Sequence, residues 1–267
     1  MKYALAAMAA VAVFSAAAAA AVRTEIVQYN QGGTRLQGYV AYDDAVEGKR
    51  PGIVVVPEWW GLNDYAKRRA RMLAQLGYVA FAADMFGEGK TTNDPNEAAQ
   101  WSGALKKDRP LLRQRVRAAL DALKARPQVD PGKTSAIGYC FGGTSVIELA
   151  RSGADVKGVV SFHGGLDAPD PSAGKNIRCR VLVCHGANDS FESPRDMEAF
   201  QKEMRDNHVD WQMNIYGNAV HSFTNPDADK HGIPGIAYNR EADQRSWQEM
   251  QLFFHDLFGM SGQIGNR

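Results

Sequence analysis

The sequence predicts an α/β fold: a mostly parallel, twisted sheet with helices on both faces and an antiparallel hairpin at its N-terminus. Short β-branched runs alternate with longer helical patterns, which is typical of parallel strands joined by crossover helices. Several of the runs are continuously apolar, as strands buried on both faces are. The chain has 267 residues without a repeat or low-complexity linker, so a single large domain accounts for it.

The first 21 residues differ in character from the rest. Lys2 is followed by an uncharged apolar run over residues 4–20, with alanines at 19–21 that suit signal peptidase cleavage. We expect residues 1–21 to be a secretory signal peptide and residues 22–267 to be one domain. The apolar run is short and alanine-rich for a membrane span, so cleavage is favoured over an uncleaved anchor. A periplasmic or secreted protein without a membrane partner is therefore expected.

The predicted elements begin with the N-terminal hairpin. Residues 23–29 and 36–42 are strand-like runs on either side of a Gly-Gly pair, which is a hairpin signal. Residues 51–57 are a continuous β-branched run bounded by prolines, as in a strand buried on both faces. Asn63 is a suitable N-cap for the helix that follows, and Gly77 is a suitable stop signal for its C-terminus.

The rest of the chain continues the alternation. β-branched apolar runs predict the remaining strands at residues 78–83, 134–137, 156–163, 180–185 and 211–216. Apolar periodicity predicts the remaining helices at residues 96–107, 110–125, 144–151, 193–207 and 238–258. Polar residues 88–96 and the Gly/Pro/Asn-rich residues 217–235 are predicted loops. Ligands in such sheets bind at the carboxyl ends of the strands.

Charge and cysteine content narrow the possible functions. The net charge is +1 without a basic block, which argues against nucleic-acid binding. Cys179 and Cys184 fall on one predicted strand, roughly 16 Å apart, too far for a disulfide. No histidine pair has zinc-ligand spacing, so neither a metal nor another cofactor is expected. We expect a monomer or weak homodimer that acts on a small molecule.

One segment suggests catalysis. Residues 138–143 read Gly-Tyr-Cys-Phe-Gly-Gly and lie between a predicted strand and a predicted helix. This is the G-x-nucleophile-x-G elbow, in which a sharp turn exposes the nucleophile at a helix N-terminus. The glycines leave room for the close approach of strand and helix. The nucleophile is Cys140, and the alternative is a buried structural cysteine beside a glycine-rich turn.

The order nucleophile, acid, histidine is completed by Asp189 and His221, which also follow predicted strands. We expect His221, oriented by Asp189, to take the proton of Cys140, whose thiolate attacks an ester or lactone carbonyl. The backbone N–H groups of Trp59 and Phe141 are expected to hold the oxyanion. The remaining histidines are interpreted as structural or pocket-lining (His163 and His185) or as surface or loop residues (His208, His231 and His255).

Glu58 lies among apolar neighbours in the loop that carries Trp59. Poor solvation there is expected to raise the pKa of the carboxyl, which could then exchange a proton near Cys140. The alternative is a carboxylate that faces water.

The chain resembles the dienelactone hydrolase (carboxymethylenebutenolidase) family of α/β-hydrolases over roughly residues 24–258. The resemblance rests on five motifs: Pro57-Glu58-Trp59-Trp60-Gly61, Ala83-Asp84-Met85-Phe86-Gly87, the elbow segment, Asp189-Ser190-Phe191 and His221-Ser222-Phe223. It implies the α/β-hydrolase fold and a Cys140, Asp189 and His221 triad. It also implies that Glu58 contacts the resting thiol and helps to activate it.

The resemblance does not extend to substrate recognition. Family members that cleave dienelactone bind the substrate carboxylate with two arginines, and Glu88 and Asn225 occupy those positions here. Four aromatic residues are expected to line the substrate pocket, with ordinary core packing as the alternative: Trp60, Tyr139, Phe191 and Phe223. Acyl or peptide hydrolysis on the same scaffold, or a non-catalytic exported binding protein, are alternative functions.

Overall fold

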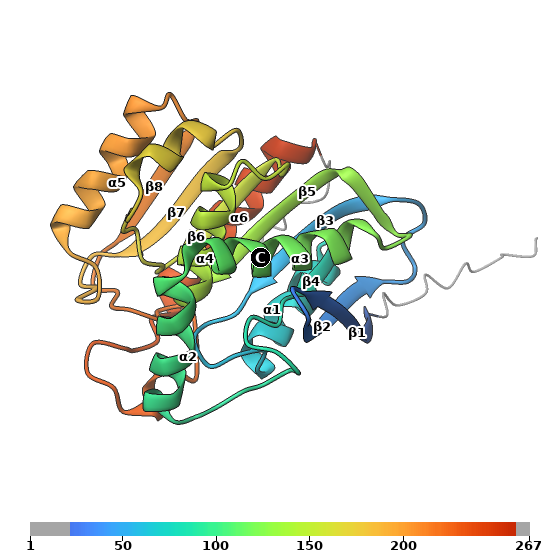
Figure 1. Cartoon of the computed structure of the whole chain (residues 1–267), viewed down its shortest axis with the longest axis horizontal. Helices are drawn as coiled ribbons and strands as arrows, with labels where there is room; N and C mark the ends of the chain where they lie inside the picture. Colours follow the sequence, from blue (N-terminus) through green and yellow to red (C-terminus); the bar gives the residue numbers. More distant parts are fainter. Residues whose placement is uncertain (1–21, 260–267) are drawn as a thin grey trace, which may run out of the picture.

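The computed structural model describes residues 22–259, which form an eight-stranded sheet flanked by helices (Figure 1). The strand order is β1-β2-β4-β3-β5-β6-β7-β8. The strands from β4 to β8 are parallel, whereas β1 pairs antiparallel with β2 and β2 antiparallel with β4. The predicted fold and N-terminal hairpin are confirmed. The predicted signal peptide, residues 1–21, lies outside the described residues.

The elements have the following bounds. The strands are β1 (Val22–Gln31), β2 (Thr34–Asp43), β3 (Arg50–Val56), β4 (Val79–Ala82), β5 (Val129–Tyr139), β6 (Gly158–Phe162), β7 (Arg180–Gly186) and β8 (Trp211–Tyr216). The α-helices are α1 (Asp64–Gln75), α2 (Pro95–Lys107), α3 (Arg109–Lys124), α4 (Phe141–Arg151), α5 (Pro194–Asp206) and α6 (Arg240–Phe258). Two short 3-10 helices, η1 (Pro171–Asn176) and η2 (Ala228–His231), lie in loops.

Helix starts follow the capping residues in the sequence. The side chain of Asn63 accepts a hydrogen bond from the Ala66 N–H at the start of α1, and Ser193 caps α5 through the Asp196 N–H. Helix α4 begins at Phe141, earlier than the periodicity predicts, because the elbow turn leads directly into the helix.

Strand β5 is longer than the sequence predicts. It begins at Val129, which pairs with Arg50, and the pairing with β3 then shifts register between Pro51 and Gly52. The polar residues 130–133, just before the predicted strand at 134–137, therefore form an irregularity within β5. A prediction from apolar runs misses them because residues 130–133 are polar.

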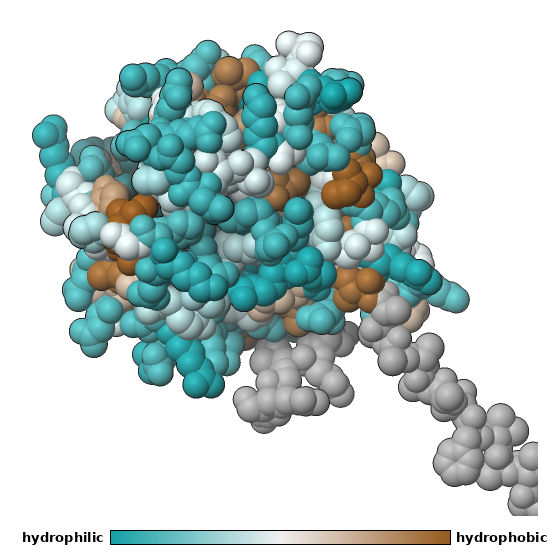
Figure 2. Space-filling view, turned by 90° about the horizontal axis from the view of Figure 1, so that it is seen from below, coloured by the Kyte–Doolittle hydropathy of each residue, from teal (hydrophilic) through white to brown (hydrophobic). Residues whose placement is uncertain are grey.

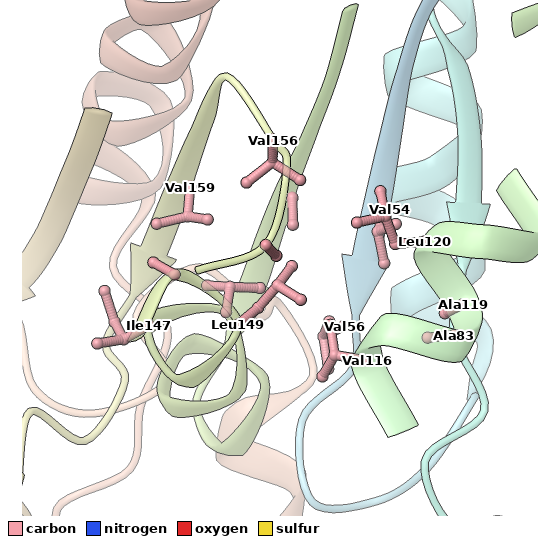
Figure 3. Close-up of a cluster of buried hydrophobic side chains, with 14 of the residues drawn as sticks. Val54, Val56, Ala83, Val116, Ala119, Leu120, Ile147, Leu149, Val156 and Val159 are labelled. Carbon is pink, nitrogen blue, oxygen red and sulfur yellow. The ribbon is translucent and has the colours of Figure 1, made fainter. Parts of the chain in front are cut away.

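The core lies on both faces of the sheet. Alternate residues of β3 point to opposite faces, with Val54 and Val56 packed under α3 and α4. Figure 3 shows Val56 beside Val116 and Val54 beside Leu120, both from α3. The alternate residues of β3, which point to the opposite face of the sheet, lie in a second buried cluster with residues of α1 and α6. This is the two-faced burial that the continuously apolar strands predict.

The outer surface is mostly hydrophilic. Figure 2 shows one face on which hydrophobic residues form separate patches among polar ones. Among the described residues, no helix combines the length and apolar character needed to cross a bilayer.

The first turn of α4 packs directly on the end of β3. A Cβ added to Gly142 would lie 2.2 Å from the carbonyl oxygen of Val56 and 2.6 Å from that of Pro57. A Cβ on Gly138 would lie 2.0 Å from the carbonyl oxygen of Gly142. Backbone atoms make all these contacts, so no side-chain rotation relieves them, and the elbow glycines are required for close approach, as predicted.

Gly142→Ala should therefore lower the free energy of unfolding by about 2 kcal/mol or more, because backbone must move to admit the methyl group. The matched control is Gly103→Ala in α2, where an added Cβ meets nothing within 4 Å. That substitution should stabilise the protein by about 0.5–1 kcal/mol through helix propensity. Urea unfolding of both variants measures the difference; equal effects would contradict the packing described.

Candidate active site

Cys140 occupies the turn between β5 and α4 in a strained backbone conformation. Its φ is 53° and its ψ is −119°, a region that residues with a side chain rarely adopt. Such conformations cost on the order of 1–3 kcal/mol and persist where the surrounding structure enforces them. The Cys140 N–H is shared between the carbonyl oxygen of Phe162 at 3.0 Å and His163 Nδ1 at 3.1 Å, both at the end of β6.

The three residues predicted as a triad meet at one edge of the sheet. Cys140 and His221 line the same cavity. His221 Nδ1 lies 2.9 Å from Asp189 Oδ2, and Asp189 Oδ1 accepts the Phe191 N–H at 2.9 Å. Both oxygens of the buried Asp189 carboxylate are therefore engaged. The imidazole keeps a proton on Nδ1 and directs Nε2 towards the cavity.

The electrostatics of this cluster favour a protonated imidazole. Burial opposes the charge on His221, but the charge and hydrogen bonding of Cys140 and Asp189 outweigh it and raise the pKa of His221 well above its usual value. A positive imidazolium beside a thiolate is the arrangement that activates cysteine nucleophiles.

The loop that carries His221 is fixed to the rest of the structure by its backbone. The His221 N–H donates to the carbonyl oxygen of Gly235 at 3.1 Å, and the Ala237 N–H donates to the carbonyl oxygen of His221 at 3.2 Å. The predicted loop over residues 217–235 thus folds back on itself, and these two hydrogen bonds fix the backbone of His221.

Glu58 reinforces this loop from the end of β3. Its Oε1 accepts the Ser222 hydroxyl at 2.8 Å, and its Oε2 accepts the Asn225 amide at 2.7 Å. The residue is 1% exposed, so the interpretation as a water-facing carboxylate is wrong. Burial raises the pKa of Glu58, although the two hydrogen bonds and the positive charges of His221 and Arg69 oppose that shift. Both oxygens of this carboxyl bond to the His221 loop.

His163 is a site residue whose role the sequence analysis did not resolve. Because Nδ1 accepts from the Cys140 N–H, the proton lies on Nε2, which is 2.7 Å from Thr224 Oγ1. That hydroxyl is in turn 2.6 Å from the Tyr65 hydroxyl of α1. Burial, followed by the positive charges of His221 and Arg69, holds the pKa of His163 well below its usual value. A neutral imidazole therefore links the elbow to the loop that follows His221.

The cavity at Cys140 has a volume of about 150 Å³. Its apolar wall comprises Trp59, Phe141, Phe191 and Ile236. Its polar wall comprises Ser102 and Lys106 of α2, Thr144 of α4, and Glu192 of the loop after β7. The volume matches the roughly 150 Å³ cavity that holds a benzene molecule in an engineered protein core, so the site suits a small group.

Three of the four aromatic residues predicted to line this pocket lie elsewhere. Tyr139 is fully buried and stacks on Phe162, because strand alternation directs it into the core beneath the elbow. Phe223 is also fully buried, against His163 and Tyr216.

Trp60, the third, stacks on His231 and lines a separate, larger cavity of about 620 Å³. The prediction that these three rings line the pocket at Cys140 is corrected accordingly. Phe191 does lie on its wall, with its ring 4.8 Å from that of His221.

The two positions where the family resemblance leads us to expect arginine hold Glu88 and Asn225, and both have other partners. Glu88 pairs with Arg35 at 3.3 Å on the surface, and Asn225 holds Glu58. The cation at the pocket is instead Lys106, in the last turn of α2, which no motif indicated. Glu192 was also missed, although its position three residues after Asp189 placed it in the same loop. Within residues 22–259, no cluster of three or more potential metal ligands is found.

Comparison with known proteins gives consistent results. The sequence model of the dienelactone hydrolase family matches residues 36–258. A crystal structure of a dienelactone hydrolase-like promiscuous phosphotriesterase from metagenomic libraries is 46% identical, with a TM-score of 0.86, covering 90% of this chain and all of that one. A protein of Saccharolobus solfataricus named "Putative carboxymethylenebutenolidase" is 28% identical over 261 residues, which cover 84% of this chain and 95% of the relative.

A more distant likeness concerns the scaffold alone. The acylaminoacyl peptidase of Pyrococcus horikoshii has a TM-score of 0.67 at 15% identity, covering 91% of this chain and 43% of that one. At this identity the likeness shows a shared fold and carries no information on the reaction.

The strain at Cys140 predicts an unusual order of stability. The free energy of unfolding of Cys140→Gly should exceed that of Cys140→Ala by about 1 kcal/mol, because glycine adopts the positive φ without a steric cost. At an ordinary position glycine is the less stable of the two by about 0.5–1 kcal/mol. Urea denaturation of both variants tests the sign, and a more stable alanine variant would show that the turn is not strained.

Proposed function

The chain belongs to the dienelactone hydrolase family, a family of hydrolases acting on ester and lactone bonds, and we propose that it cleaves small esters or lactones with Cys140 as nucleophile. One observation carries this proposal. Cys140 and His221 line one small cavity, and His221 Nδ1 lies 2.9 Å from the Asp189 carboxylate.

In the acylation step, the thiolate of Cys140 attacks the carbonyl carbon and forms a carbon–sulfur bond. The tetrahedral intermediate collapses with cleavage of the carbon–oxygen bond, and the departing alkoxide takes a proton from the His221 imidazolium. An acyl-thioester of Cys140 and a free alcohol result; a lactone gives one linear product that stays attached through its acyl end.

In the second step, neutral His221 takes a proton from water, and the hydroxide oxygen attacks the thioester carbon. The carbon–sulfur bond breaks, the thiolate leaves, and the carboxylic acid product is released. The thiolate and imidazolium are thereby restored. Asp189 stabilises the positive imidazolium at each stage and fixes the direction of Nε2.

The oxyanion is assigned to two backbone N–H groups. Phe141 is the first residue of α4, and N–H groups of a first helical turn have no acceptor within the helix. Trp59 lies in the turn closed by the hydrogen bond from the Gly61 N–H to the carbonyl oxygen of Glu58. Contact between Gly142 and the β3 end brings these two segments together, which supports a shared role.

Glu58 is proposed to position the His221 loop through Ser222 and Asn225. Its resemblance to the family glutamate that contacts the resting thiol suggests a second arrangement, in which the carboxyl turns towards Cys140. Either role depends on a carboxyl that is buried and held by neutral donors, as found here.

The proposed site of action is the periplasm or the exterior of the cell, on the strength of the leader-like residues 1–21. The reaction requires only water and the ester, which suits an exported enzyme.

Removal of the thiol should abolish turnover. Cys140→Ala is expected to lower kcat/KM for 4-nitrophenyl acetate by about 10³-fold or more, and Cys140→Ser to retain a small residual rate. Cys179→Ala is the matched control, because Cys179 lies in the core at the opposite end of β7 from the site. The panel should include lactones and a neutral phosphate triester, given the activity named for the 46%-identical relative. Ester turnover unaffected by Cys140→Ala would exclude the mechanism.

Loss of the Asp189 charge should act through His221. Asp189→Asn is expected to lower kcat/KM by about 10²- to 10⁴-fold, because the imidazolium loses its support and its orientation. The pKa of His221 should fall as well, since the Asp189 carboxylate is one of the groups that raise it. NMR titration of the imidazole measures this shift. An unchanged His221 pKa in the variant would argue against the proposed pairing.

A further inference from the structure

Glu192 is a carboxyl group in the substrate cavity that the mechanism does not use. It lies in the loop after β7, and its Oε2 accepts the Leu166 N–H at 3.0 Å. Its Oε1 lies next to Gly165, where an added Cβ would be 3.1 Å from this oxygen and 2.9 Å from Thr144 Oγ1. Gly165 and Thr144 line the same cavity as Cys140. The carboxyl group is therefore built into the pocket wall.

The groups around Glu192 are mostly acidic. Burial raises the pKa of Glu192 to about 7, and the negative charges of Asp167, Asp189 and Asp196 act in the same direction. The hydrogen bond from Leu166 opposes this shift. Two of these neighbours have cationic partners: Asp167 pairs with Arg109 at 2.6 Å, and Asp189 with His221. Asp196, in the first turn of α5, accepts the Ser193 hydroxyl.

One cation shares the cavity wall with Glu192 apart from His221. Lys106 projects from the last turn of α2 and is exposed, so its ammonium group remains hydrated and its field is screened by water and salt. Glu192 is only partly exposed, so its charge acts more strongly on the contents of the cavity. The two positions where the family resemblance leads us to expect arginine hold Glu88 and Asn225, so they add no positive charge to offset that of Glu192.

We propose that Glu192 makes the pocket at Cys140 select uncharged acyl groups over acyl groups that carry a carboxylate. This inference rests on the proposed function at Cys140 and specifies its substrate class. Cys140 and Glu192 line the same cavity of about 150 Å³, so an acyl group bonded to Cys140 extends into the space that Glu192 borders. A second carboxylate there loses hydration and faces a like charge, which is unfavourable at short range in a partly dehydrated site.

The selectivity depends on pH with a definite sign. Below about pH 7 Glu192 is largely protonated, and its O–H can donate a hydrogen bond to an anion. Above that pH it is a carboxylate and repels one. Discrimination against anions therefore increases as the pH rises through about 7.

Two alkylating reagents of nearly equal size test this directly: neutral iodoacetamide and anionic iodoacetate. Their rate constants with Cys140 are measured from pH 6 to 8.5 by mass spectrometry, each divided by the rate constant for free cysteine. The ratio of the two cancels the thiolate fraction, which is common to both reagents. Cys140→Ala gives the background from Cys179 and Cys184, which are both buried.

In the wild type, the ratio of the normalised rate constant for iodoacetamide to that for iodoacetate should rise roughly five- to tenfold across this pH range. This is the change expected for one charge added at short range. In Glu192→Gln the ratio should stay flat and low; the amide oxygen can still accept the Leu166 N–H, which protects the fold. Glu198→Gln, an exposed substitution on α5, should behave as the wild type.

A wild-type ratio that does not change with pH would overturn the proposal without any variant. A rise that persists in Glu192→Gln would overturn it as well, because another group would then be responsible. These outcomes are distinct from failure of the proposed function, which would appear as ester turnover that does not depend on Cys140.

Discussion

The site depends on the direct contact between the first turn of α4 and the end of β3. Gly142 brings the helix backbone against the carbonyl oxygens of Val56 and Pro57, with no side chain between them. This contact sets where the helix begins, and so where Cys140 turns and where the N–H groups of the first helical turn point. Cys140, the proposed nucleophile, adopts its positive φ at the one residue that joins β5 to this helix.

Buried polar contacts then hold the remaining groups of the site near Cys140. The loop after β8 is held through three neighbouring side chains, with Ser222 and Asn225 bonded to Glu58, and Thr224 bonded to His163. His163 also accepts the N–H of Cys140. His221, the proposed general base, is thus positioned by residues that follow β3 and β6 in addition to its own loop. Satisfied networks of this kind specify one arrangement, and the loss of one member leaves a buried group unpaired.

The sequence was sufficient for the fold and for the residues at strand ends, because apolar periodicity, capping residues and elbow glycines each have a local physical cause. It was insufficient for the pocket wall. The order of elements does not reveal which face an aromatic ring occupies: Tyr139 and Phe223 are core residues, and Trp60 belongs to another cavity. Lys106 and Glu192 reach the pocket only through the packing of α2 and of the loop after β7. His163 was recognisable as a strand-end histidine, but its bond to the Cys140 N–H required coordinates.

Adjacent tryptophans line the two cavities, and Glu58 is bonded to a residue in the wall of the larger one. Trp59 faces the smaller cavity and Trp60 the larger, with their rings 4.9 Å apart, and Asn225 lines the larger cavity while holding Glu58. The Glu58 carboxyl is therefore linked through the Asn225 amide to the wall of the larger cavity, and through Ser222 to the loop that carries His221.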